Sequence, residues 1–365
     1  MVERFSRLDP DTALAAPLSQ PAHPPECQRP TGGHAATRVG ATHSGGRWGG
    51  KPWGMDDLVY LTEADVRTLV QMPALRARLR EAFAQFSTGG ADVPARIAAR
   101  APKGLLAAMP GYVAGVGLVV KAVSVFAGNH GTDVPSHQGL IVVCDEDNGT
   151  PVAIIDGTSI TALRTAASAA VAADLLARPD STVLAIIGAG VQGHAHLSAF
   201  ADLRPWSSVR VASRSRGSAM ALAARHPSAV VASFQEAVRG ADVICLTTDA
   251  DHPVIEPQWV SAGAHVGSVG NRAELHEGFT HGTVFVEWAG AAGTPPPAGA
   301  VELLHVPAQR VVELGTVLTG GHPGRSSADE VTVYKSTGHA IEDAAAARLV
   351  LDEALAKGIG LRLPR

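Results

Sequence analysis

Short apolar runs, each followed by a more polar or alanine-rich segment, occupy the chain from residue 183 onward. The first run, Val183–Ile187, is apolar at every position, as a strand buried on both faces of a parallel sheet requires. Strands that alternate with helices indicate a doubly wound parallel sheet, so this region is predicted to have that α/β fold. The predicted strands are Val183–Ile187, Val209–Ala212, Ala229–Ala232, Val243–Leu246, His265–Val269 and Val284–Glu287.

Before residue 180 the pattern differs, because strand-like segments follow one another and helical segments stand at either end. Gly104–Phe126 mixes glycine with aliphatic residues and predicts antiparallel strands that turn at Pro110-Gly111. Thr62 and Thr161 each precede a helical segment, where a hydroxyl can cap free N–H groups. The other predicted elements are strands Leu58–Leu61, Leu140–Cys144, Val152–Ile155 and Val331–Tyr334, and helices from Thr62 to about Phe86, Ala162–Leu176 and His339–Leu355.

Residues 1–54 are rich in proline, glycine and histidine and show neither a helical nor a strand period. We therefore expect a disordered extension here. The ordered pattern begins at Met55, which we interpret as the natural start of the protein.

The turn after the first apolar run has the pattern G-x-G-x-x-G, formed by Gly188, Gly190 and Gly193. Gly188 permits the tight turn, Gly190 lets a diphosphate approach the backbone, and Gly193 lets the helix pack close to the strand. Val191 and Gln192 begin that helix, whose N-terminus would face the anion. With a strand before it and a helix after it, the pattern predicts a dinucleotide site.

About twenty residues later, the second predicted strand ends in Ser213-Arg214-Ser215-Arg216. An NAD site typically has an acidic residue here, which accepts hydrogen bonds from the ribose hydroxyls. A serine hydroxyl and a guanidinium would instead bind a 2′-phosphate. The sequence therefore favours NADP(H) over NAD(H).

Composition and charge exclude several other classes of protein. The net charge of −4 implies no surface for nucleic acid or anionic membranes. No apolar run reaches the roughly 18 residues that span a bilayer. Cys27, Cys144 and Cys245 are far apart and form no C-x-x-C, which fits a reducing cytoplasm, and no metal-ligand spacing is present.

Several motifs occur in an order that resembles the ornithine cyclodeaminase/mu-crystallin family. They are Met109-Pro110, KAVSVF from Lys121, TALRTAA around Arg164, IIGAGVQG ending at Gly193, and EVTVYKSTGHAIEDAAAA from Glu330. The resemblance covers roughly residues 58–361. It implies a Rossmann nucleotide domain inserted into a split α+β substrate and dimerisation domain, and commonly a homodimer. We therefore expect the substrate domain to comprise residues 55–178 and 321–365, with the nucleotide domain at 179–320.

The resemblance assigns roles to three cations. Arg96 would bind the substrate carboxylate, for which a guanidinium is well suited. Arg164 would face that carboxylate and the cofactor diphosphate; it is placed in the first turn of its helix, where the dipole disfavours a cation unless an anion is near. Lys121 would otherwise be expected in solvent, but the resemblance implies a buried catalytic lysine with a lowered pKa. Further cofactor contacts are expected at Ser136, Thr248, Val269 and Ser336.

Two departures from the family pattern bear on the reaction. Asn271 replaces an aspartate that acts as general acid/base in cyclodeaminases, and Ala107 replaces their glutamate. Glu274 and His276 are nearby titratable substitutes for the missing acid/base. The favoured function is an NAD(P)(H)-dependent oxidoreductase that transfers hydride at the Cα of an imino or amino acid, like ketimine or pyrroline-carboxylate reductases or amino acid dehydrogenases. The alternatives are ornithine cyclodeaminase, a lyase that converts L-ornithine to L-proline and ammonia, and a crystallin-like binder without turnover.

Overall fold

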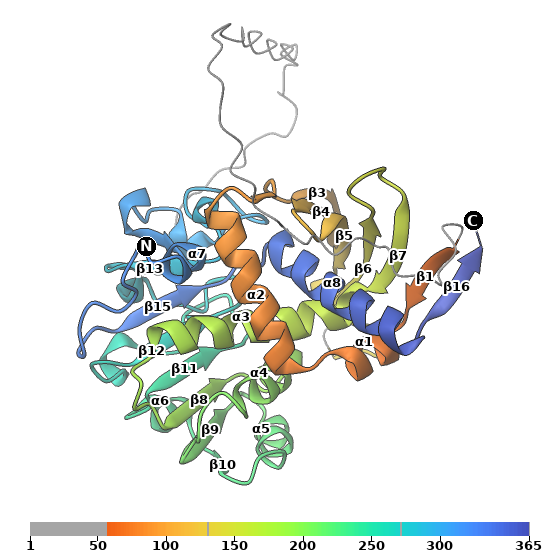
Figure 1. Cartoon of the computed structure of the whole chain (residues 1–365). Coiled ribbons are helices and arrows are strands. Elements are labelled where there is room, and N and C mark those ends of the chain that lie inside the picture. The colour runs from red at the N-terminus through yellow and green to blue at the C-terminus, as the bar shows by residue number, and fades with distance from the viewer. Residues whose placement is uncertain (1–56, 130, 271, 365) are drawn as a thin grey trace, which may run out of the picture. The chain divides into compact units, whose positions relative to one another are not determined.

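Helices lie between two eight-stranded sheets in the computed structural model of the protein, which describes residues 57–129, 131–270 and 272–364 (Figure 1). The predicted extension at residues 1–54, Met55 and Asn271 lie outside these residues.

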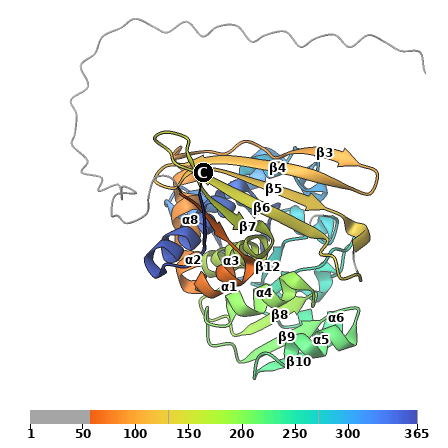
Figure 2. The same cartoon turned by 90° about the vertical axis from the view of Figure 1, so that its right-hand side faces the viewer.

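The first sheet has the strand order β16-β1-β7-β6-β5-β4-β2, with β3 paired to β4. Its strands are mostly antiparallel, and only β1 and β7 pair in parallel. In Figure 2, helices α2, α3 and α8 lie on one side of this sheet, between it and the second sheet. The strands are β1 (Asp57–Leu61), β2 (Ala91–Asp92), β3 (Ile97–Ala101), β4 (Gly104–Val113), β5 (Gly117–Val125), β6 (His137–Cys144), β7 (Pro151–Asp156) and β16 (Leu361–Pro364).

The turn predicted at Pro110-Gly111 is wrong, because β4 continues through both residues to Val113. The residues Gly104–Ala108 of β4 pair with β3, whereas Tyr112 and Val113 pair with β2. Pro110 therefore lies between these two partners, at a place where its missing N–H removes no ladder hydrogen bond on that side.

The helices of this region also differ from the prediction at their ends. The helix expected from Thr62 to Phe86 is two helices, α1 (Glu63–Leu69) and α2 (Met72–Ser87), and Pro73 stands in the first turn of the second. Helix α3 (Gly157–Leu176) begins before the predicted Thr161, since Asp156 accepts from the Ser159 N–H and caps it. Arg164 therefore lies beyond the first turn, and the expected conflict with the helix dipole is absent.

The second sheet is parallel throughout, with the order β10-β9-β8-β11-β12-β15-β13-β14. The chain runs outward from β8 in one direction and then restarts at β11 on the other side, which is the switch point of a doubly wound sheet. The predicted fold class is confirmed. The strands are β8 (Val183–Ile187), β9 (Ser208–Ala212), β10 (Ala229–Val231), β11 (Val243–Leu246), β12 (His265–Ser268), β13 (Val284–Val286), β14 (Val311–Glu313) and β15 (Thr332–Lys335).

Strand β15 follows the boundary predicted at residue 320, yet it pairs with β12 and β13 inside the parallel sheet. The domain limits themselves stay a prediction. The remaining helices are α4 (Val191–Phe200), α5 (Arg216–Ala223), α6 (Phe234–Val238), α7 (Leu314–Leu318) and α8 (Ala340–Lys357).

Helix α3 is long and apolar enough to cross a membrane by length and composition, in contrast to the expectation that no such run exists. However, 78% of its most apolar window is buried inside the protein. Alanines such as Ala166 and Ala170 are fully covered, so we interpret α3 as the core helix that both sheets share.

Candidate active site

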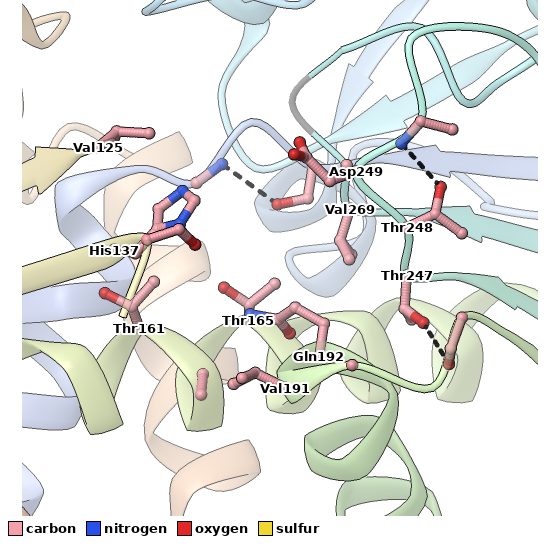
Figure 3. Close-up of a pocket in the computed structure, with 18 of the residues that line it drawn as sticks. Val125, His137, Thr161, Thr165, Val191, Gln192, Thr247, Thr248, Asp249 and Val269 are labelled. Carbon is pink, nitrogen blue, oxygen red and sulfur yellow. Dashed lines mark hydrogen bonds between the residues drawn. The ribbon is translucent and has the colours of Figure 1, made fainter. Parts of the chain in front are cut away.

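A cavity of about 680 Å³ opens at the switch point of the parallel sheet and extends to the first sheet. Figure 3 shows Val125 and His137 on one side of it, Thr248 and Val269 on the opposite side, and Thr165 of α3 between them. The cavity is therefore lined by the carboxyl ends of parallel strands, where doubly wound folds bind ligands, and by the antiparallel sheet.

The predicted site residues come together around this cavity, although they are distributed from residue 96 to residue 336. The lining includes Arg96, Lys121, Ser136, Arg164, Gly188, Gly190, Val191, Gln192, Ser213, Arg214, Thr248, Val269 and Ser336. Among the predicted site residues, Gly193 is not part of this lining.

The three glycines of the turn meet different surroundings. Gly188 has a φ of 117°, and a Cβ there would lie 2.7 Å from Thr247 Oγ1. A Cβ on Gly193 would lie 2.2 Å from the Gly188 carbonyl oxygen, so the helix can approach the strand only with glycine. A Cβ on Gly190 would meet no atom within 4 Å and would project into open space. Backbone N–H groups at the start of α4 are thus accessible to an anionic group.

Lys121 is buried on the inner face of β5, with 1% of its surface exposed. Its Nζ lies 2.8 Å from the Asp343 carboxylate and 3.4 Å from Thr161 Oγ1. Burial lowers the pKa of Lys121 to about 8, although the Asp343 carboxylate raises it. A lysine with this pKa can both hold and release a proton near neutral pH.

Arg164 is buried in α3 and contacts two carboxylates of α8. It donates to Glu342 Oε2 at 2.7 Å and to Asp343 Oδ1 at 3.2 Å. Burial opposes the charged form, but the carboxylates of Glu342 and Asp343 keep the pKa of Arg164 above its usual value. The anion that the sequence analysis expected near Arg164 is thus found within the protein itself.

Arg96 is held just before β3 by the chain after β15. Its guanidinium donates to the backbone carbonyls of Thr337 and Gly338. Burial lowers the pKa of Arg96, and the nearby Arg164 lowers it further. The nearby Arg100, by contrast, is exposed and donates to the Pro296 carbonyl.

Glu287 supports the cavity from behind, and sequence reasoning gave it no role. Its Oε1 accepts from the N–H groups of Thr337 and Gly338 and from the Ser336 hydroxyl. Burial and the Glu342 carboxylate raise the pKa of Glu287 to about 7. Because these three donors follow one another in the chain, Glu287 fixes the loop 336–338 that lines the cavity.

Two further sequence hypotheses concern residues near Asn271. Glu274 lies behind the cavity wall and its carboxylate is held by Thr248, Ser268, Val269 and Gly270. His276 accepts from the Gly278 N–H with its Nδ1. In the described chain, neither residue is part of the cavity lining.

Ala107, where cyclodeaminases have a glutamate, is buried on the same face of β4 as Met109, which pairs with Lys121. The position therefore brings a methyl group, and no carboxylate, next to Lys121. Within the described residues, no group of three or more His, Cys, Asp or Glu side chains could hold a metal ion.

Comparison with known proteins places these features in a family. The model of the ornithine cyclodeaminase/mu-crystallin family matches residues 56–358. Ketimine reductase mu-crystallin of Mus musculus is 37% identical over 290 residues, which cover 77% of this chain and 91% of the mouse protein.

Two solved structures share the fold over nearly their whole length. That of Thermococcus litoralis Δ(1)-pyrroline-2-carboxylate reductase with NADH and L-proline is 29% identical, with a TM-score of 0.78, and covers 84% of this chain and 100% of that one. An archaeal alanine dehydrogenase dimer with bound NAD is 29% identical, with a TM-score of 0.76, and the match covers 84% of this chain and 99% of that one. As its motifs predicted, the chain belongs to the ornithine cyclodeaminase/mu-crystallin family.

Proposed function

We propose that this protein is an NAD(P)H-dependent reductase of imino acids, which adds a hydride to the Cα of a C=N group beside a carboxylate. One observation carries the proposal: buried Lys121 and two arginines line the same cavity as the glycine turn at Gly190. The site thus combines a proton donor, a carboxylate site and a dinucleotide site. The relatives named ketimine reductase and pyrroline-2-carboxylate reductase support this class of reaction.

The cavity fits a dinucleotide. Gly190 leaves open space for a diphosphate, and Val191, 70% exposed, extends beside it. We infer a preference for NADP(H), because Ser213 and Arg214 line the cavity after β9, where a 2′-phosphate would need a hydroxyl and a cation. When bound, the reduced dinucleotide supplies the hydride.

The protein's own residues then position the substrate and move one proton. Arg96 and Arg164 bind the carboxylate, which orients the C=N group against the cofactor side of the cavity. Lys121 donates a proton to the imine nitrogen as the hydride reaches Cα, so that the C=N π electrons become the nitrogen lone pair. Hydride plus proton convert the imine to an amine, and neutral Lys121 regains its proton from solvent.

A cyclodeaminase reaction is the second candidate function, and the wall beside Lys121 argues against it. Ala107 provides no carboxylate to bind a second amine, and Asn271, outside the described residues, is no general base. The same cavity could also serve a non-enzymatic binder, which would hold cofactor and carboxylate without turnover.

We further infer a homodimer formed through the outer face of the first sheet. Leu106 on β4, Leu118 on β5 and Leu140 on β6 are each about half exposed, at 54%, 44% and 45%. Tyr112, which pairs with Leu118, is also exposed on this face. Large apolar side chains exposed on one sheet face mark a surface that another chain covers, and the related alanine dehydrogenase is described as a dimer. Leu118→Lys should convert the dimer to monomer in analytical ultracentrifugation; a parent protein that sediments as a monomer would refute this inference.

We also propose a cytoplasmic location. Cys144 and Cys245 are free thiols in the described chain, which suits a reducing compartment. Fractionation of cells that express the full chain would test this location.

The test of the proposed function is NADPH oxidation with cyclic imines, and with pairs of 2-keto acids and amines, by the purified full chain. Lys121→Met should bind NADPH as the parent does but turn over about 10²–10⁴-fold more slowly. Ammonia release from L-ornithine without added cofactor would favour the cyclodeaminase instead. Binding of NADPH and L-proline without oxidation of any imine would favour the binder.

A further inference from the structure

Asp343 stands between two of the cations that face the cavity. It is fully buried in the first turn of α8, lies 2.8 Å from Lys121 Nζ, and accepts from Arg164 Nε at 3.2 Å. Lys121 comes from a strand of the first sheet and Arg164 from α3. One carboxylate therefore fixes two cations from different elements, and it does so from outside the cavity lining.

Neighbouring Glu342 makes a different contact. It is also fully buried, pairs with Arg164 at 2.7 Å, and accepts from the His339 N–H at the start of the same helix. Asp343 therefore contacts both Lys121 and Arg164, whereas Glu342 contacts Arg164 and the His339 N–H at the start of α8 but not Lys121.

The charged groups around Lys121 come from three elements besides its own strand. They are Asp343 on α8, Arg164 on α3 and Arg96 just before β3. Glu342 and Glu287 lie near the two arginines, and the neutral ring of His339 lies near Arg96. Asp343 favours the ammonium form of Lys121, and the two arginines disfavour it. Among these groups, Asp343 is thus the one that touches Lys121 and holds its proton in place.

We propose that Asp343 is a positioning residue for the reaction: it keeps Lys121 protonated and aimed at the substrate nitrogen, and it acts only through Lys121 and Arg164. The inference rests on the proposed reductase function, since it names what prepares the proton donor of that reaction. Without Asp343, Lys121 would face two arginines with no counter-charge and would lose its proton at a lower pH.

The test uses the pH dependence of kcat/KM for NADPH oxidation with the best imine substrate of the parent. For the parent, kcat/KM should fall above about pH 8 as Lys121 loses its proton. Asp343→Asn should move this fall to lower pH by about 1–3 pH units, the usual effect of an opposite charge in contact. An Asp343→Asn enzyme whose alkaline limb stays in place would overturn the proposal.

Glu342→Gln is the matched control, because it is the adjacent buried carboxylate and contacts Arg164. It should raise KM for the imino acid and leave the alkaline limb where it is in the parent. An equal shift of the limb in both variants would show a general effect of lost negative charge and refute the specific role of Asp343.

A double-mutant cycle with Lys121→Met separates positioning from folding. If Asp343 acts through Lys121, Asp343→Asn should lower kcat far less in the Lys121→Met background than in the parent. Equal losses in both backgrounds would contradict the proposal. Failure of the parent to oxidise NADPH with any imine would instead refute the proposed function, and circular dichroism of each variant identifies loss of fold.

Discussion

Glu274 ties the end of strand β11 to the loop after β12 by accepting both the N–H and the hydroxyl of Thr248, at 2.8 and 2.6 Å. Its other oxygen accepts from the Gly270 N–H at 2.6 Å. All these partners are donors, so an acceptor-only carboxylate suits the position. Glu274, which the sequence suggested as a titratable substitute for the missing aspartate, is therefore a structural residue in this arrangement.

Glu274→Gln is expected to lower the free energy of unfolding by about 2–4 kcal/mol, because the amide NH₂ must face a donor. Urea denaturation of parent and variant measures this loss. NADPH binding should weaken as well, since Thr248 and Gly270 line the cavity. A variant of parental stability whose kcat has lost a pH-dependent limb would instead identify Glu274 as an acid/base.

Two glycines of the turn provide a matched pair of substitutions. Gly193→Ala places a methyl 2.2 Å from the Gly188 oxygen and should cost about 1–3 kcal/mol of stability or more. Gly190→Ala meets no neighbour within 4 Å and should change stability by no more than about 1 kcal/mol. Its methyl would nevertheless occupy the space of a diphosphate, so NADPH affinity should fall. Thermal melts measure the change in stability, and fluorescence titration measures NADPH affinity. Full NADPH affinity in Gly190→Ala would mean that the diphosphate does not bind at this turn.

The cofactor preference can be tested at two adjacent arginines. Arg214 lines the cavity, whereas Arg216 begins α5 and is absent from the described lining. Arg214→Ala should weaken NADPH binding at least tenfold with little effect on NADH, and Arg216→Ala should change neither. Ser213→Asp should reverse the preference, because a carboxylate repels the 2′-phosphate and accepts from a free ribose. Equal affinity of the parent for both cofactors would contradict the assignment.

The parts of this site that could be predicted from sequence are those formed by residues close together in the chain. The glycine turn is formed by residues within one strand–helix unit, so its pattern and its position were predictable from Gly188 to Gly193. The parallel order of the second sheet followed from the alternation of strands and helices. Lys121 needed the family resemblance, because a single lysine in an apolar strand has the same pattern whether it faces solvent or a cavity.

The buried carboxylates could not be predicted in this way. Glu342 and Asp343 occur in the first turn of an alanine-rich helix, where acidic residues are common because they complement the helix dipole. Their cationic partners are more than 170 residues away in sequence, and only the packing of α8 against α3 and β5 brings them together. Similarly, the early start of α3 depended on Asp156, which also ends strand β7.

Stability should fall on acidification, because three histidines are buried in the folded protein. Burial lowers the pKa of His196 and His339 to about 4 and that of His265 to about 3. Unfolded histidines bind protons near pH 6.5, so around pH 5.5 the unfolded chain holds nearly three protons that the folded protein lacks. Glu287 opposes this with one proton, since burial raises its pKa to about 7 in the folded state.

The excess of about two protons in the unfolded state predicts that the free energy of unfolding decreases by about 2–3 kcal/mol for each pH unit below about pH 6. Urea denaturation at pH 7, 6 and 5 measures this slope. The ring of His196 stacks on Phe200. His196→Leu removes one of the three histidines, which lowers the net excess from two protons to one, so the slope should be about half that of the parent. Glu287→Gln should make the slope steeper, because Glu287 is the group among the described residues that gains a proton on folding in this range. A free energy of unfolding that is constant from pH 7 to 5 would mean that these histidines are protonated in the folded protein, and the buried neutral state assigned to them would be wrong.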